Sequence, residues 1–273
     1  MAAAAGGGGQ PHRLAFTDWG FVHASTDGGK VWDALYVRAS QRNPVGAALP
    51  ATSNWQSNGL MDTSVWGVGW TDSADTMFAW DTDIRGSISN DGGRTFSFNY
   101  TGHPLNTMYH TVWEKDSGTL YGATSGIHDM YQSTHLTDAI LDAKGPNIGR
   151  VIASQDGGSS FSVVFDFEMP VVWVALDQTR RNRLYASVVN SVSGGIYVAD
   201  GLDGTSPAKF QQLSSPLRTQ GHPYSIVSLP DGALVVSYSG RMDNHRKTFY
   251  NSSGVFYLPA GKIRILVVPA WHL

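Results

Sequence analysis

Short apolar segments alternate with polar turns along the chain, and this pattern predicts strands rather than helices. In one part of the chain, residues 64–70 form an apolar run, while residues 95–100 alternate between apolar and polar positions. Runs of this length, rich in Val, Ile, Trp, Tyr and Phe, are typical of buried and half-buried strands. This part of the chain therefore predicts a unit of four strands, at 64–70, 76–82, 85–89 and 95–100.

The same plan recurs before and after this unit. Only residues 135–144, inside a longer loop at 126–148, have helical spacing, and Thr137 is their candidate N-cap. An incomplete unit precedes the unit at 64–100, and three complete units follow it. Their predicted strands are 13–18, 21–25 and 31–37, then 108–114, 119–125, 149–154 and 161–167, then 171–177, 183–189, 194–200 and 210–214, then 224–230, 233–239, 254–259 and 262–268.

One eight-residue turn occurs three times, with the pattern Ser-x-Asp-Gly-Gly-x-x-aromatic. Its aspartates, Asp27, Asp91 and Asp156, recur at intervals of 64 and 65 residues. A fixed period with a shared turn indicates an array of similar units. Four-stranded units repeated around an axis form a β-propeller. We therefore expect an all-β fold, a β-propeller of about five four-stranded blades, with a partial propeller as the alternative.

Residues 13–273 are expected to form this single domain, and residues 1–12, with their Ala and Gly runs, a flexible tail. The repeated turn has a physical explanation at each position. The Asp carboxylate can accept hydrogen bonds from backbone N–H groups of its own turn. The glycines permit positive φ without a Cβ clash. The aromatic residue of each copy is expected to pack beneath its turn; these residues are Trp32, Phe96 and Phe161.

Composition and charge narrow the possible partners. The net charge is −3, which gives no electrostatic basis for binding nucleic acid or an anionic membrane. The chain has no cysteine, so disulfides and thiolate metal sites are excluded. No apolar run approaches the roughly 20 residues of a membrane span. We expect neither a nucleic-acid nor a membrane partner, and the oligomeric state stays open.

The repeated turn resembles the Asp-box, or BNR repeat. Asp-boxes occur in sialidases, in the xyloglucan-cleaving glycoside hydrolases of family 74 and in sortilin-type receptor domains. The resemblance implies that each turn joins the third and fourth strands of a blade, away from the ligand face, and that it stabilises the blade. Sialidases also carry an Arg-Ile-Pro stretch near the first blade, and this sequence has none. The resemblance is therefore closer to family 74.

Candidate functional residues gather in the loops between second and third strands. Because strands in a blade are antiparallel, these loops lie on the face opposite the repeated turns, together with the loops that lead into each blade. They contain carboxylates, histidines and aromatic rings. Sugar rings stack on Trp and Tyr, and sugar hydroxyls bond to Asp, Asn and His. These residue types therefore predict a carbohydrate ligand or substrate on this face.

The predicted catalytic residues are Asp18, Asp83, Asp129 and His128. The predicted substrate-binding residues are Trp19, Arg85, Tyr131, His103, Asn106, Arg241, Asp243 and His245. No tight ligand pair such as His-x-x-x-His occurs, so neither a catalytic metal nor a cofactor is expected. A structural calcium ion held by loop carboxylates stays open.

The resemblance to family 74 also covers a few of these residues. That family carries a Thr-Asp-x-Gly-Gly stretch shortly before its first Asp-box, and its Asp is one of two catalytic carboxylates. Thr17-Asp18 is similar, which implies a catalytic role for Asp18, and Thr82-Asp83 is a second copy. The second glycine is Phe21 here, and Arg85 departs from the pattern in the other copy.

Three functions fit the predicted face. The first is a glycoside hydrolase acting on a polysaccharide or oligosaccharide through paired carboxylates. The second is a non-catalytic propeller that binds glycans or proteins. The third is a polysaccharide lyase that uses a His and a Tyr, with His128 and Tyr131 as its best pair. A secreted or extracellular location is expected for any of them.

Overall fold

The computed structural model describes most of the chain, and every structural statement below refers to this part. The described residues are 2–5, 12–17, 22–35, 37–44, 47–48, 50, 52–57, 63–130, 137–202, 208–216, 219, 221–242, 248–251, 253–260 and 266–267.

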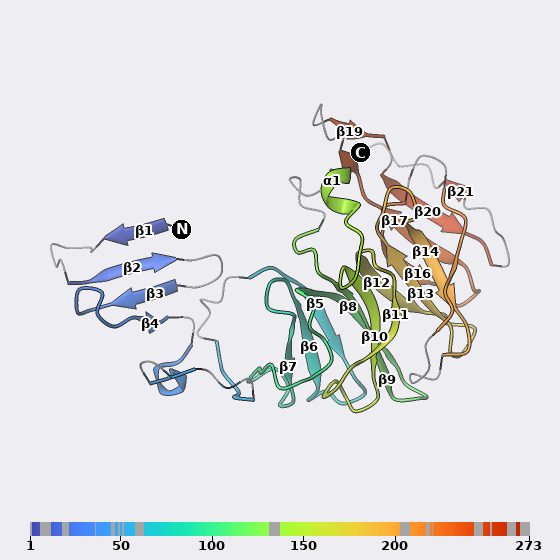
Figure 1. Cartoon of the computed structure of the whole chain (residues 1–273). Helices are drawn as coiled ribbons and strands as arrows, with labels where there is room; N and C mark the ends of the chain where they lie inside the picture. The colour runs from blue at the N-terminus through green and yellow to red at the C-terminus, as the bar shows by residue number, and fades with distance from the viewer. Residues whose placement is uncertain are drawn as a thin grey trace.

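The N-terminal sheet has the strand order β1-β2-β3-β4 and is drawn apart from the other sheets in Figure 1. Its strands are β1 (Ala2–Ala5), β2 (Leu14–Thr17), β3 (Val22–Ser25) and β4 (Asp33–Ala34). Strand β1 lies within the range expected to be a tail, and it pairs antiparallel with β2. Ladder hydrogen bonds use backbone groups alone, so a run of alanines can supply such a strand.

The second sheet has three strands, β5 (Val65–Trp70), β6 (Met77–Asp81) and β7 (Ser87–Ser89). The strand predicted at 95–100 is reduced to isolated bridges, Ile88 with Ser97 and Trp55 with Phe96. The ring of Trp55 lies 6.1 Å from that of Phe96, measured between centroids. The alternating pattern therefore marks the edge of the sheet correctly but not a regular strand.

The third and fourth sheets follow the sequence pattern closely, each in chain order of its strands. The third contains β8 (Thr107–Glu114), β9 (Thr119–Ser125), β10 (Gly149–Ser154) and β11 (Ser162–Asp166). The fourth contains β12 (Val171–Leu176), β13 (Leu184–Val188), β14 (Gly195–Ala199) and β15 (Gln211–Gln212). Between β9 and β10 lies the helix α1 (Asp138–Leu141), with Thr137 at its N-cap position.

The fifth sheet is built from β16 (Pro223–Ser228), β17 (Leu234–Tyr238), β20 (Gly254–Leu258) and β21 (Leu266–Val267). A short hairpin of β18 (Arg241–Met242) and β19 (Phe249–Tyr250) occupies the loop between β17 and β20. Two further elements are minor: a single 3-10 turn at Ala39–Gln41, and a parallel bridge between Thr137 and Met242 beside α1. No described helix is long and apolar enough to cross a membrane.

The sheets from β5 onward stack in series, as Figure 1 shows. The first strand of each sheet contacts the first strand of the next, in the order β5, β8, β12, β16. Apolar side chains fill the space between neighbouring sheets; Phe78 and Trp80 of the second sheet, for example, pack with Leu120 and Ile152 of the third. Burial of these large side chains supplies the main stabilisation of the stack.

The three repeated turns share one hydrogen-bond pattern. In the second copy, Ser89 Oγ donates to Asp91 at 2.9 Å and accepts from Gly93 N at 2.9 Å, while Thr95 N donates to Asp91 at 2.9 Å. The copies centred on Asp27 and Asp156 repeat these three bonds. Each turn is therefore closed by its own Ser and Asp side chains.

The aromatic residues of the three turns differ in burial. Phe161 is 8% exposed and meets Phe78 edge to face at 5.6 Å. Phe96 is half-buried against Trp55. Trp32 lies over its own turn, where its Nε1 donates to Gly29 O at 3.0 Å, yet it remains 39% exposed. The expected packing is thus strongest in the third turn, where the neighbouring sheet supplies Phe78.

Candidate functional site

Seven of the twelve predicted site residues lie in the described part of the chain: Asp83, Arg85, His103, Asn106, His128, Asp129 and Arg241. The other five, Asp18, Trp19, Tyr131, Asp243 and His245, lie outside the described residues, and their roles stay predictions. The seven fall into a cluster around Asp83 and two separate structural contacts.

The cluster joins two neighbouring sheets. Asp83 lies in the turn between β6 and β7, and His128 and Asp129 follow β9. Nδ1 of His128 is 3.1 Å from Asp129 Oδ2 and 3.6 Å from Asp83 Oδ1. One donor or acceptor atom from each of the three side chains lies within 4.8 Å of the others. The structure thus brings together two predicted carboxylates and the predicted histidine.

Both carboxylates are held on backbone that is rare for residues other than glycine. Asp83 has φ 64° and Asp129 has φ 47°, which places both in the left-handed region. Aspartate is among the few residues that enter this region with modest cost. Two such positions facing each other across a sheet boundary indicate that the surrounding hydrogen bonds impose the conformation.

Asn106, immediately before β8, holds Asp83 from the neighbouring sheet. The Asp83 backbone N–H donates to Asn106 Oδ1 at 3.1 Å, and Asn106 Nδ2 donates back to Asp83 Oδ1 at 3.3 Å. Thr107 Oγ1 also donates to Asn106 Oδ1, at 2.7 Å. Sequence reasoning assigns Asn106 to substrate binding, and the structure shows its amide engaged with Asp83.

Tyr109 closes the loop that carries His128 and Asp129. Its hydroxyl donates to the carbonyl of Ile127 and accepts from the N–H of Met130, both at 2.9 Å. The Met130 side chain is fully buried and packs with the Tyr109 ring in one apolar cluster. Burial raises the pKa of Tyr109 far above its ordinary value, so its hydroxyl stays protonated. The loop is therefore anchored on both sides of the His-Asp pair.

Exposure within the cluster differs between its members. The side chains of Asp83 and His128 are 47% and 45% exposed, and that of Asp129 is 18% exposed. Oδ1 of Asp129 is buried without a hydrogen-bond partner among the described residues. The exposed carboxylate of Asp83 can accept a hydrogen bond from a ligand hydroxyl, and His128 can exchange a proton with either carboxylate. The same three side chains are also the described residues best placed to hold a cation.

Two other predicted binding residues make contacts within the protein. His103 is 2% exposed, and its Nε2 lies 2.8 Å from the carbonyl of Arg85. Burial lowers the pKa of His103 to about 4, so this ring is neutral near pH 7. Arg241 forms a bidentate ion pair with Asp138 of α1, and both side chains are mostly buried. Their described contacts hold loops in place.

The structure adds residues that sequence reasoning does not select. Asp81, at the end of β6, is completely buried, and Ser87 Oγ donates to its Oδ2 at 2.9 Å. Burial raises the pKa of Asp81 to about 6. Thr82 and Thr107 are also buried beside the cluster. The repeated Thr-Asp pair is the signal that could have identified Thr82. Asp81 has no such signal because it lies within the strand expected at 76–82, and Thr107 has none because it lies just before the strand expected at 108–114.

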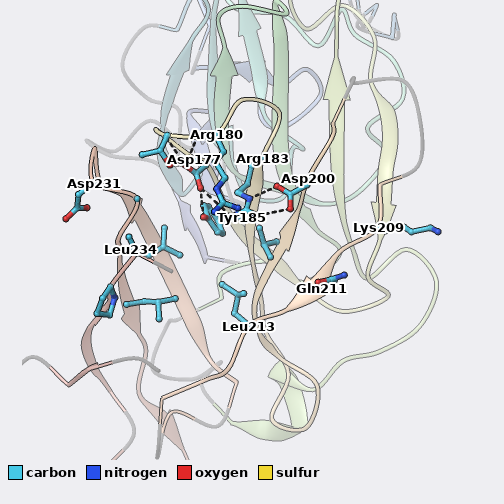
Figure 2. A pocket seen from close by; sticks show the side chains of 16 residues that line it. Asp177, Arg180, Arg183, Tyr185, Asp200, Lys209, Gln211, Leu213, Asp231 and Leu234 are labelled. Atoms are coloured by element: carbon cyan, nitrogen blue, oxygen red, sulfur yellow. Dashed lines mark hydrogen bonds and ion pairs between the residues drawn. The ribbon is translucent and has the colours of Figure 1, made fainter. Parts of the chain in front are cut away.

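A pocket of about 720 Å³ lies between the fourth and fifth sheets, beside the turn that joins β12 and β13 (Figure 2). Its charged groups are largely matched among themselves: Arg183 binds Asp200 at 2.5 and 2.7 Å, and the Tyr185 hydroxyl donates to Asp177 at 2.6 Å. We base the candidate site on the cluster, because it joins acid and base groups that are partly exposed.

Comparison with known proteins shows the fold. No family model matches the chain, and no curated protein matches it. Among solved structures, an ancestral GH74 enzyme matches 97% of this chain with a TM-score of 0.54 and 18% identity. The chain spans 30% of that enzyme's length. This likeness, together with the stacked antiparallel sheets, shows a β-propeller fold.

Two further solved structures are similar at lower scores. A GH74 enzyme of Niastella koreensis matches 91% of this chain and 43% of its own length, with a TM-score of 0.46 and 17% identity. A gluconolactonase from Xanthomonas campestris matches 92% of this chain and 73% of its own length, with a TM-score of 0.48 and 14% identity.

Proposed function

We propose that the chain is a glycoside hydrolase in which Asp83 and Asp129 act as a carboxylate pair, assisted by His128. The observation that carries this proposal is that the three side chains, supplied by two neighbouring sheets, meet within 4.8 Å. Cleavage of a glycosidic bond needs one group to protonate the leaving oxygen and a second carboxylate to act at the anomeric carbon. Asp129 with His128, and Asp83, can divide these tasks.

The spacing of the pair favours a retaining reaction. Inverting glycosidases separate their carboxyl groups by about 6.5–9.5 Å to admit a water, whereas retaining enzymes bring them to about 5–5.5 Å. One oxygen of Asp83 and one of Asp129 lie within 4.8 Å of each other, which is below the separation of an inverting pair. In this assignment Asp83, the more exposed carboxylate, is the nucleophile. Asp129, hydrogen-bonded to His128, gives the proton to the leaving oxygen and later removes one from water.

Several finer assignments accompany this function. The repeated turns are Asp-boxes, supported by their common hydrogen bonds, and they stabilise the blades. The five sheets that begin at β1, β5, β8, β12 and β16 are five blades. The substrate is a polysaccharide or oligosaccharide, and the protein acts outside the cell. Asp18 remains a candidate on the strength of its Thr-Asp context.

The test is release of reducing ends from a panel of polysaccharides by the whole chain and two variants. Asp83→Asn and Asp129→Asn should each lower kcat by about 100-fold or more, the range for losing an acid, base or nucleophile. Asp72→Asn, in the exposed turn between β5 and β6, is the matched control and should leave kcat unchanged. Glycan binding without turnover, unaffected by both variants, would replace the hydrolase with a non-catalytic module.

A further inference from the structure

The cluster rests on two buried hydroxyls that link the backbone N–H of Asp129 to Asn106 and, through Asn106, to Asp83. The backbone N–H of Asp129 donates to Thr82 Oγ1 at 3.3 Å. Thr82 Oγ1 lies 2.9 Å from Thr107 Oγ1. Thr107 Oγ1 donates in turn to Asn106 Oδ1 at 2.7 Å, and Asn106 binds Asp83 through both its oxygen and its nitrogen. The chain runs from one carboxylate residue to the other without a gap.

The direction of these bonds follows from the number of protons. Thr107 has one hydroxyl proton and gives it to Asn106, so Thr82 must donate to Thr107. Thr82 then has lone pairs left to accept from Asp129. The three bonds from Asp129 to Asn106 therefore point the same way, and Asn106 Nδ2 continues that direction to Asp83 Oδ1, while the Asp83 N–H donates back to Asn106 Oδ1. Successive hydrogen bonds of one direction strengthen each other in a medium of low polarity.

Burial makes this series of hydrogen bonds rigid. Thr82 is 1% exposed and Thr107 is 0% exposed, so water does not compete for either hydroxyl. A buried hydroxyl that loses its partner costs about 1–3 kcal/mol, which opposes any movement that breaks the chain. The two carboxylates lie on different sheets, and the Thr82–Thr107 contact crosses that boundary.

We propose that Thr82 and Thr107 are positioning residues that fix the distance between Asp83 and Asp129. This proposal rests on the proposed function for its catalytic consequence. It also gives the Thr-Asp pair at 82–83 a physical role: the threonine binds the neighbouring blade's catalytic loop, while the aspartate faces the ligand. Loss of either hydroxyl loosens the spacing of the carboxylates without removing a reacting group.

Thr107 offers a clean test because a matched control lies on the same strand. Thr107→Val removes the hydroxyl and keeps the shape, and Thr107→Ser keeps the hydroxyl. Thr111→Val removes another buried hydroxyl of β8. This hydroxyl accepts from Trp80 Nε1 at 2.9 Å and takes no part in the hydrogen bonds that link Asp129 to Asp83. Thr107→Val and Thr111→Val should lose similar stability, so a catalytic difference between them reports on positioning.

Two measurements separate this proposal from the function. We expect Thr107→Val to lower kcat about tenfold or more with KM changed by less than about twofold, while Thr107→Ser and Thr111→Val keep kcat within about threefold. Independently of turnover, amide hydrogen exchange at Asp83 and Asp129 should accelerate about tenfold or more in Thr107→Val alone. Unchanged exchange overturns the proposal, as does unchanged kcat in an active enzyme. Faster exchange in a chain without hydrolase activity overturns the proposed function and leaves the positioning role in place.

Discussion

Replacing the buried Asp81 by Asn should stabilise the protein at neutral pH. The carboxyl group of Asp81 is completely buried, and burial raises its pKa from 3.8 to about 6. A group whose folded pKa is raised contributes stability at low pH and loses it as the pH rises through the folded value. Above about pH 7 the native state therefore bears the cost of an ionised buried carboxylate.

The size of this cost follows from the shift. About two pH units at about 1.4 kcal/mol each give about 3 kcal/mol at pH 8. Asn keeps an oxygen for the Ser87 hydroxyl, but its amide nitrogen replaces Oδ1, which has no partner among the described residues. Because this nitrogen is also left unpaired, we expect a net gain of about 1–3 kcal/mol.

Urea unfolding at two pH values measures the effect. The advantage of Asp81→Asn over the parent should shrink by about 2 kcal/mol between about pH 8 and about pH 4.5, where native Asp81 is protonated. Asp72→Asn, an exposed control, should stay within about 0.5 kcal/mol of the parent at both. An effect of Asp81→Asn that is the same at both pH values would refute the argument, because it could not come from ionisation.

Three further predictions concern the rest of the molecule. Burial lowers the pKa of His103 and His222 to about 4 and that of His110 to about 3, so stability should fall as the pH drops from about 6.5 toward 4, because the unfolded chain binds protons that these native rings do not. Urea midpoints measured across this pH range check the prediction. If the midpoint of His222→Leu falls with pH as much as the parent's does, His222 contributes nothing. Asp91→Ala should cost about 1–3 kcal/mol through lost turn hydrogen bonds and leave kcat unchanged; lost activity at full stability would place function on the face of the turns. Activity should survive a chelator, and loss that zinc restores would establish a metal at Asp83, His128 and Asp129.

Local patterns predict the strands well where the burial of one sheet depends on its own residues. Residues 119–125 and 149–154 form strands over the whole range that their apolar runs indicate. The prediction at 95–100 is less accurate, because the edge of that sheet is completed by Trp55, some forty residues earlier in the chain, through a bridge to Phe96. No local pattern contains that contact.

The site could be predicted only in part for the same reason. The propeller topology places Asp83, His128 and Asp129 on one face, and the structure shows that they meet. The sequence could not show that Asn106 and His103 are engaged within the protein, since both residue types equally suit a ligand. Thr107 and Tyr109 lie at the start of β8, and no local pattern marks their hydroxyls, which hold Asn106 and the loop that carries His128 and Asp129.

The most direct test of the carboxylate pair is a double-variant measurement of kcat. Groups that act as one unit lose their effect together, so their free-energy losses do not add. If Asp83 and Asp129 work on one bond, the variant with both Asp→Asn changes should be no more than about threefold slower than the slower single variant. Losses that multiply, or single variants that retain the parent's kcat, would contradict the pair.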